Sequence, residues 1–293
     1  MGWDVHDGFR HIQYSTNVLN LQGVYEFFKI SHVREEEVDG ITGSQVEMTN
    51  KRLEKYYPES KFGGFSDIDG TIVFYNRVNA LINKNDTILD IGCGRGKFTE
   101  DSNLYQRNLR MIKGKVKQVI GIDVDINSEG NPTLDIFKKI DINNPWPIEN
   151  NSIDLAFCYQ VLEHIDNPDL LFSECNRVLK KNGYLCIRTT NKWGYIGLGA
   201  RIIPHSFHKR ILHHIQNNRK DEDIFPTFFK CNTIPAIRRM LNKYNFNGVV
   251  YGYNSEPGYF DNSYLWYSTM KLYLSICPQI LKTSLFVFAR KNK

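Results

Sequence analysis

The sequence lacks several patterns that would place it in a specialised class of protein. Its six cysteines form no C-x-x-C pair, so neither a zinc ribbon nor a disulfide framework is indicated. It contains no run of about 18 apolar residues, the length that spans a bilayer. Residues 1–10 lack the apolar stretch of a secretory signal. We therefore expect a cytoplasmic protein with reduced thiols and no transmembrane segment.

Excess charge of either sign is also small. Lys and Arg total 37 against 32 Asp and Glu, a net charge of +5 over 293 residues, which is too little to predict a nucleic-acid partner. An excess of the same size lies within residues 201–220, which contain five Lys or Arg and no acidic residue. A basic segment beside a binding site favours an anionic small molecule. The alternative is a solvated helix that pairs with the acidic residues 221–223.

Short apolar segments alternate with helix-like segments from residue 87 onwards. Strands are predicted at 87–91, 118–123, 137–141, 152–158, 184–189, 248–253 and 284–290. This alternation implies βαβ units, and therefore an α/β fold whose parallel sheet has helices on both faces. Residues 1–71 are predicted to form an N-terminal cap or extension. Residues 72–293 form the main domain, which an inserted cap interrupts at about 193–235.

Helices are predicted at 74–82, 168–181 and 263–276. The second has the clearest boundaries, since Asn167 can cap it and Pro168 suits its first turn. Asn182-Gly183 is expected to end this helix in the left-handed conformation, with Lys180 and Lys181 in its last turn.

The strongest motif is the glycine-rich turn after the first predicted strand, Asp90-Ile91-Gly92-Cys93-Gly94-Arg95-Gly96. Glycines allow a sharp turn and let a ligand approach main-chain N–H groups. A dinucleotide fingerprint would need glycine where Lys97 stands, and a P-loop would need Ser or Thr where Phe98 stands. The turn, which is expected to open a helix, therefore suits a ligand without a pyrophosphate.

Carboxylates follow the next two predicted strands. Asp123 ends the second strand, where a carboxylate can accept hydrogen bonds from two ribose hydroxyls, and Asp125 is the weaker alternative. Asp141-Ile142 follows the third strand and would offer a carboxylate to an adenine amino group and an apolar side to its ring. The two strands together predict a nucleoside site beside the glycine-rich turn.

With these motifs the chain resembles the class I S-adenosylmethionine-dependent methyltransferases. The resemblance rests on residues 90–96, 121–123, 154–164 and 177–183, which occur in the family's order. It implies a Rossmann-like sheet of seven strands, the last antiparallel, with S-adenosylmethionine across the ends of strands one to four. The donor-binding residues that it implies are Asp90, Gly92, Cys93, Gly94, Gly96, Asp123, Val124, Asp141, Ile142, Tyr159 and Gln160.

A methyl group on a positively charged sulfur is intrinsically reactive, so such an enzyme must mainly align the acceptor and remove a proton from it. The candidate bases are His205 and His208 in the inserted cap, followed by His164. The histidines of the cap lack neighbouring ligands at metal spacing, so no metal site is expected. Residues 190–193 and 225–233 loosely resemble methyltransferases of polysaccharide biosynthesis. That likeness implies transfer to an oxygen or nitrogen of a sugar, a glycan precursor or another small molecule.

Two alternatives from other classes stay open. One is a non-catalytic protein that binds S-adenosylmethionine and regulates or scaffolds a partner. The other is an RNA methyltransferase, although residues 158–161 do not supply the Asn-Pro-Pro-Tyr-like motif of base amino methylation.

A further motif, Asp67-Ile68-Asp69-Gly70-Thr71, resembles the start of a haloacid-dehalogenase phosphatase. It lacks the buried strand that should precede it, and a polar turn into a helix is predicted instead.

Overall fold

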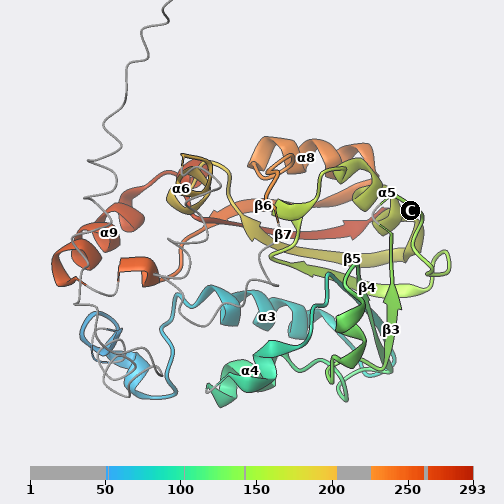
Figure 1. Cartoon of the computed structure of the whole chain (residues 1–293), viewed down its shortest axis with the longest axis horizontal. Helices are drawn as coiled ribbons and strands as arrows, with labels where there is room; N and C mark the ends of the chain where they lie inside the picture. The colour runs from blue at the N-terminus through green and yellow to red at the C-terminus, as the bar shows by residue number, and fades with distance from the viewer. Residues whose placement is uncertain are drawn as a thin grey trace, which may run out of the picture. The chain divides into compact units, whose positions relative to one another are not determined.

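The computed structural model describes residues 51, 53–101, 103–141, 143–202, 226–260 and 263–292. By its contacts the chain divides into residues 1–40 and 41–293, and all described residues belong to the second unit. The described residues contain a sheet of order β3-β2-β1-β4-β5-β7-β6 (Figure 1). Its strands are β1 (Thr87–Ile91), β2 (Gln118–Asp123), β3 (Ile136–Lys139), β4 (Ile153–Tyr159), β5 (Leu179–Thr190), β6 (Phe246–Tyr253) and β7 (Ser284–Lys291).

Strand direction sets where the side chains of the site can meet. The strands from β3 to β5 pair in parallel, whereas β7 runs antiparallel to both β5 and β6. The predicted seven-stranded Rossmann-like sheet with an antiparallel last strand is confirmed. The carboxyl ends of β1, β2, β4, β5 and β6 consequently lie at one edge, where β7 begins.

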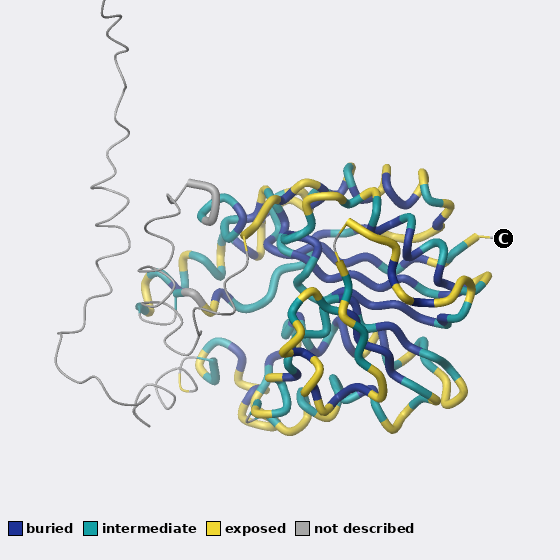
Figure 2. The backbone as a smooth tube through the Cα atoms, turned by 45° about the vertical axis from the view of Figure 1, so that its right-hand side comes forward, coloured by how far each residue is buried: buried dark blue, intermediate teal, exposed yellow. Residues whose placement is uncertain are grey.

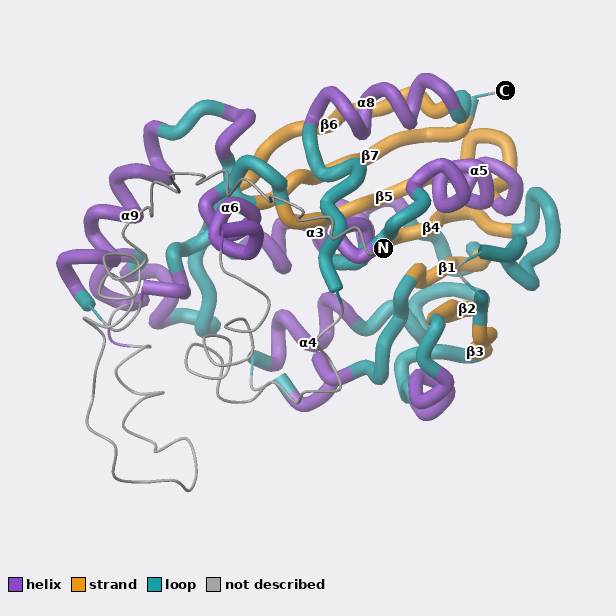
Figure 3. Tube along the Cα trace, turned by 45° about the horizontal axis from the view of Figure 1, so that its top comes forward, coloured by secondary structure: helices purple, strands orange, loops and turns teal. Residues whose placement is uncertain are grey.

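Helices cover both faces of this sheet, as predicted (Figures 1 and 3). One face packs against α5 and α8, and the other against α3 and α4. The helices α6 and α9 lie beyond the edge at which β5 ends (Figure 1). Their bounds are α3 (Gly70–Leu81), α4 (Leu104–Arg110), α5 (Pro168–Val178), α6 (Tyr195–Ile202), α8 (Ile234–Lys243) and α9 (Tyr264–Ile276).

The buried residues follow the central strands, and the outer helices carry the exposed ones (Figure 2). Ile88, Ile122, Leu155 and Ile187 on four adjacent strands are fully buried, which is expected for parallel strands covered on both faces. All six cysteines are free thiols, and only Cys93 among them is partly exposed. None of the helices among the described residues is long and apolar enough to cross a membrane.

The starts of two helices follow from their capping residues. Asp69 accepts hydrogen bonds from the backbone nitrogens of Thr71 (2.8 Å) and Ile72 (3.0 Å) at the start of α3. The predicted polar turn into a helix is therefore confirmed. Asn167 accepts from the Leu170 nitrogen (3.2 Å) and caps α5, also as predicted.

The predicted end of the helix at 168–181 is wrong. Helix α5 ends at Val178, and the chain enters β5 directly at Leu179. Asn182 does adopt the left-handed conformation (φ 66°), but it does so where residues 180–183 bulge out of the pairing with β4. An Asn-Gly pair suits a bulge as well as a helix end, so its pattern could not distinguish the two. Lys180 in the bulge binds Asp154 on β4 (2.8 Å).

The glycine-rich turn also leads into a different element from the one expected. It is followed by a short 3₁₀ helix, Lys97–Glu100, and not by an α-helix. The proposed boundaries of the N-terminal cap and of the inserted cap at 193–235 stay predictions. Helix α6 lies within the proposed insert, while residues 203–225 lie outside the described part of the chain.

Candidate functional site

The glycine-rich turn at the end of β1 forms an open cradle. The Gly92 nitrogen donates to the Ile122 carbonyl (2.8 Å), which fixes the turn to β2. Gly92 has φ 70°, and a Cβ there would overlap Val161 Cγ2. Gly94 has φ 53°, and no heavy atom of the described residues lies within 4 Å of the position that a Cβ would take. The turn thus needs glycine at both positions and leaves room for a ligand above the second.

Asp123 connects this turn to the end of β2. Its Oδ2 accepts from the Gly94 nitrogen and its Oδ1 from the Asp125 nitrogen, both at 2.9 Å. Each carboxylate oxygen retains a second lone pair for a hydroxyl donor. The weaker alternative, Asp125, is committed to Arg95 (3.1 Å) and to the Asn127 nitrogen (3.0 Å). Hence Asp123 is the better placed of the two to accept from a diol.

Asp90 at the end of β1 has an unusual protonation equilibrium. Burial raises the pKa of Asp90 to about 7; Arg110 opposes this rise and the nearby Asp123 carboxylate adds to it. The Arg110 guanidinium, at the end of α4, lies over the Phe98 ring at 4.3 Å from its centroid. A desolvated carboxylate and a guanidinium therefore face one small region, an arrangement that complements a ligand with both an ammonium and a carboxylate.

Sequence reasoning missed Asn131, which holds the turn from behind. Its Nδ2 donates to the carbonyls of Cys93 (3.1 Å) and Gly94 (2.9 Å), and its Oδ1 accepts from the Thr133 nitrogen (2.9 Å). Because Asn131 is buried, these bonds are shielded from water and keep the cradle in shape. It belongs to a loop without a motif, so nothing in its local sequence indicated this role.

The remaining predicted donor-site residues lie at the ends of β2 and β3. Val124 is 43% exposed beside Asp123. Asp141 is exposed after β3 and accepts from the Asn143 nitrogen (2.9 Å) and from Asn144 Nδ2 (2.8 Å). Ile142 lies outside the described residues. Asp141 and Val124 thus keep surface that a ligand could cover.

Of the three histidines proposed as bases, only His164 belongs to the described residues. His164 ends the 3₁₀ helix Leu162–His164, and its Nδ1 lies 2.8 Å from the Pro226 carbonyl oxygen. It thereby fixes the segment that precedes α8. His205 and His208 lie outside the described residues. Among the described residues, no group of three His, Cys, Asp or Glu side chains is arranged to hold a metal ion.

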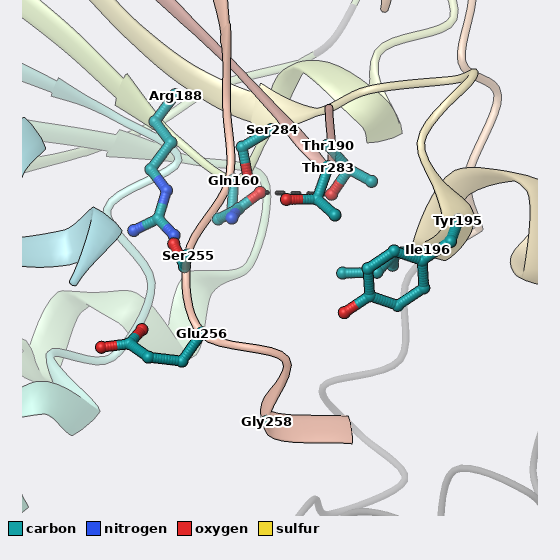
Figure 4. Close-up of a pocket in the computed structure, with 10 residues that line it drawn as sticks. All are labelled: Gln160, Arg188, Thr190, Tyr195, Ile196, Ser255, Glu256, Gly258, Thr283 and Ser284. Atoms are coloured by element: carbon teal, nitrogen blue, oxygen red, sulfur yellow. Dashed lines mark hydrogen bonds between the residues drawn. The ribbon is translucent and has the colours of Figure 1, made fainter. Parts of the chain in front are cut away.

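Tyr159 and Gln160 at the end of β4 lead from the cradle to a second hollow. The Tyr159 hydroxyl bonds Thr71 Oγ1 (2.8 Å) and accepts from Arg188 Nη1 (2.6 Å). The backbone N–H of Gln160, a residue with φ 57°, donates a hydrogen bond to the Arg188 carbonyl oxygen (2.8 Å). The Gln160 side chain points into the hollow. This cleft has a volume of about 400 Å³. Figure 4 shows the residues that line it, which are Gln160, Arg188, Thr190, Tyr195, Ile196, Ser255, Glu256, Gly258, Thr283 and Ser284.

Sequence reasoning named Gln160 and placed Thr190, Tyr195 and Ile196 in segments that it connected with the acceptor, but it predicted none of the other residues that line this cleft. They come from the ends of β5 and β6, the start of β7 and helix α6, which meet only in the folded sheet. One signal was available, since Arg188 is a charged residue near the end of an otherwise apolar strand. A charge at such a position needs partners or a function.

Comparison with known proteins now identifies the family. Residues 72–250, more than half of the chain, match a family model described as a methyltransferase domain. The chain belongs to this methyltransferase family. S-adenosylmethionine, the cosubstrate that the sequence predicted, is the methyl donor of the class. An assignment to polysaccharide biosynthesis does not follow from the match.

Individual relatives of the methyltransferase are distant. An uncharacterized methyltransferase of Schizosaccharomyces pombe is 28% identical over 45% of this chain and 48% of its own length. A ubiquinone biosynthesis O-methyltransferase of Glaesserella parasuis is 25% identical over 53% of this chain and 67% of its own. The chain spans about half the length of the curated relatives it matches. A crystal structure of an Archaeoglobus fulgidus SAM-dependent methyltransferase aligns over 80% of this chain and 97% of that one, with 18% identity and a TM-score of 0.48.

The residues of the cradle fit this donor. The open space above Gly94 admits a ligand close to the backbone, and the spare lone pairs of Asp123 suit the two hydroxyls of a ribose. Asp90 and Arg110 complement the ammonium and carboxylate of a methionine moiety. The described residues of the turn are therefore compatible with S-adenosylmethionine.

Proposed function

We propose that the methyltransferase transfers the methyl group of S-adenosylmethionine to an oxygen or nitrogen atom of a small polar acceptor. The leading class of acceptor is a sugar or glycan precursor. The observation that carries the proposal is the placement of Gln160. It directly follows Tyr159 at the cradle and also lines the polar cleft. A donor in the cradle and an acceptor in the cleft would therefore meet at the end of β4.

The protein's part on the donor side is to bind and orient. Asp123 accepts from the ribose hydroxyls, while Asp90 and Arg110 hold the two charged ends of the methionine moiety. When bound, S-adenosylmethionine supplies a methyl group on a positively charged sulfur. Because the cradle is fixed by backbone bonds to β2 and by Asn131, little ordering is left to be done on binding.

The cleft supplies polar groups on the acceptor side. Hydroxyls of Thr190, Ser255, Thr283 and Ser284 line it, which supports an acceptor that carries several hydroxyls. Burial raises the pKa of Glu256 above its usual range, and its carboxylate accepts a hydrogen bond from Ser66 Oγ. A carboxylate with a raised pKa is a better proton acceptor from an alcohol or amine. We assign Glu256 as the base, a role for which His205 and His208 also remain predictions.

The proposed base is an alternative to His164, whose role as a base stays a prediction. The His164 ring is directed to the Pro226 carbonyl and does not line the cleft. Substituting Glu256→Gln keeps the size of the side chain but removes its basicity. We expect the turnover number to fall by about 100-fold with an unchanged dissociation constant for S-adenosylmethionine.

The deciding experiment measures release of S-adenosylhomocysteine from the full chain with a panel of sugars, sugar nucleotides, small phenols and quinols. Quinols belong in the panel because several relatives carry the name ubiquinone biosynthesis O-methyltransferase. Release that depends on one acceptor class supports the proposal. Donor binding without release on any member would favour a regulatory or scaffold protein, and release only on RNA, with strong dependence on salt, would favour the RNA methyltransferase.

A further inference from the structure

Arg188 on β5 uses only one edge of its guanidinium to hold the fold. The side chain is 8% exposed, and its Nη1 donates to Tyr159 (2.6 Å) and to Thr71 Oγ1 (3.0 Å). Its Nε is buried and has no hydrogen-bond partner among the described residues. The edge formed by Nε and Nη2 therefore makes no hydrogen bond with the described residues, although Glu256 interacts electrostatically with the guanidinium.

A second unpartnered polar group lies beside this edge. Ser255 Oγ, in the loop after β6, is also buried without a hydrogen-bond partner among the described residues. Gly70 marks the point at which the two groups converge, because a Cβ there would overlap Ser255 Oγ and lie 2.8 Å from Arg188 Nη2. Figure 4 shows the Arg188 guanidinium and Ser255 together at one side of the cleft, across from Tyr195 and Ile196.

Buried polar groups without partners are rare in folded proteins because their lost hydration is not replaced. Two such groups that line one cleft indicate that a ligand completes them. The Nε–Nη2 edge of an arginine is a fork that matches two oxygens of a carboxylate or phosphate. A serine hydroxyl beside the fork can donate to a third lone pair of the same anion.

We propose that Arg188 and Ser255 bind a carboxylate or phosphate group of the methyl acceptor, an inference that rests on the function proposed above. Glu256 limits the acceptor further, because its carboxylate lines the same cleft and interacts electrostatically with Arg188. The single guanidinium can therefore offset the charge of one anionic group of the ligand at most. The acceptor is therefore a hydroxylated or amino compound with a single anionic group. A nucleic-acid backbone, with a charge on every nucleotide, does not meet this condition.

A purely structural role for Arg188 makes a different prediction. Its bonds to Tyr159 and Thr71 use Nη1 alone. If Arg188 served only these bonds, no anion would bind its other edge, and the stability of the protein would respond equally to all anions. An anion site instead makes stability depend on anions that fit the fork, and makes that dependence require Ser255 as well.

The test measures the melting temperature of the full chain, saturated with S-adenosylhomocysteine, in inorganic phosphate, in acetate and in chloride at equal ionic strength. We expect phosphate or acetate to raise it by about 3 °C over chloride, because the anion binds only the folded state. The rise should fall below about 1 °C in Arg188→Lys, which lacks the fork, and in Ser255→Ala. A larger rise of the wild-type melting temperature in phosphate than in acetate indicates a phosphorylated acceptor, and a larger rise in acetate indicates a carboxylated one.

Matched controls are available on the surface. Arg238→Lys on α8 and Ser275→Ala on α9 alter exposed side chains that do not line the cleft and should retain the full response. If Arg188→Lys loses its native circular dichroism spectrum, the comparison of Ser255→Ala with Ser275→Ala decides. An equal response in wild type, Arg188→Lys and Ser255→Ala, or no response in the wild type, would overturn the proposal.

Two further measurements on the same samples distinguish failure of the anion site from failure of the proposed function. Calorimetry of S-adenosylmethionine binding and the release assay report on the donor cradle and on methyl transfer. A selective anion response without methyl transfer would refute the function and support the anion site. Transfer to neutral and anionic acceptors at equal kcat/KM would support the function and refute the anion site.

Discussion

Two aspartates in the cradle show how one side-chain type acquires two behaviours. Asp123 accepts two backbone N–H groups, from Gly94 and from Asp125, and each of its carboxylate oxygens keeps a second lone pair. Asp90 lies nearby but is desolvated, and its pKa is raised to about 7. The first is therefore suited to hold neutral hydroxyls, and the second to respond to a ligand's positive charge.

The first prediction concerns Asp123. Asp123→Ala removes both the proposed ribose contact and the bond that positions Gly94, so the dissociation constant for S-adenosylmethionine should rise ten-fold or more. Isothermal titration calorimetry measures it directly. Glu129→Ala, an exposed residue in the 3₁₀ helix Ile126–Gly130 that follows β2, is the matched control. Equal affinities for wild type and Asp123→Ala would refute the assignment.

The second prediction is a dependence of stability on pH. The pKa of Asp90 is about 7 in the folded chain and 3.8 in its ordinary state, so the folded protein holds a proton that the unfolded chain has released. Between about pH 4 and pH 7 this group lowers the free energy of unfolding as pH rises, by at most about 1.4 kcal/mol per unit. Above that window the loss stays constant.

Substitution Asp90→Asn isolates this contribution. Urea unfolding across the same pH window should show the variant gaining stability relative to the wild type as pH rises, because the asparagine has no proton to lose. Parallel curves for the two proteins would show that Asp90 ionises normally.

Helix α5 is attached to the loop before β4 by one arginine. Arg177 binds Glu174 (2.6 Å), the Ile148 carbonyl (2.7 Å) and the Trp146 carbonyl (3.0 Å). Glu174 in turn accepts from the Trp146 nitrogen (2.6 Å). Although burial opposes it, these hydrogen bonds lower the pKa of Glu174. The network holds the chain that leads into β4, and thus the strand that ends at Tyr159 and Gln160.

The third prediction follows from this attachment. Arg177→Ala leaves the buried Glu174 carboxylate without its cation, and should lower the free energy of unfolding by about 2–3 kcal/mol. Chemical denaturation measures the loss. Arg239→Ala, an exposed arginine on α8, should change stability by less than about 0.5 kcal/mol. A similar small effect for both variants would mean that the network does not stabilise α5.

Across the whole molecule, the sequence predicted the sheet well because strands and the glycine-rich turn are local patterns. The order of motifs around Asp90 and Asp123 was sufficient to predict the family, whereas the donor-binding roles of these residues stay predictions. Arg110, Arg188 and Glu256 were not found because each lies in a segment without a motif, and they reach the site only through the packing of the sheet. The predicted end of α5 at Asn182 was wrong for the same reason. An Asn-Gly pair suits both a helix end and a bulge, and the pairing of β5 with β4 decided between them.

The fourth prediction concerns stabilisation of the fold by a bound ligand. S-adenosylhomocysteine at about 100 times its dissociation constant should add about 2.7 kcal/mol to the free energy of unfolding, which raises the melting temperature by about 5–10 °C. If Asp123→Ala binds S-adenosylhomocysteine ten-fold more weakly, the same ligand concentration should add only about half as much to its free energy of unfolding. ATP should not stabilise the chain, because the turn lacks a pyrophosphate fingerprint. Equal shifts with ATP would contradict the predicted preference for a ligand without a pyrophosphate.

The reversed direction of β7 has a consequence for how acceptor preference can change. Because β7 begins where β5 and β6 end, the loops on either side of α9 deliver Ser255, Glu256, Thr283 and Ser284 to the cleft, whereas the donor cradle is encoded before residue 165. This part of the proposed acceptor cleft is therefore encoded apart from the proposed donor cradle, although Gln160, Arg188 and Thr190 of the cleft lie outside residues 254–284. Exchanging residues 254–284 with the equivalent segment of a relative is a direct route to chimaeras with a new acceptor range and an unaltered donor.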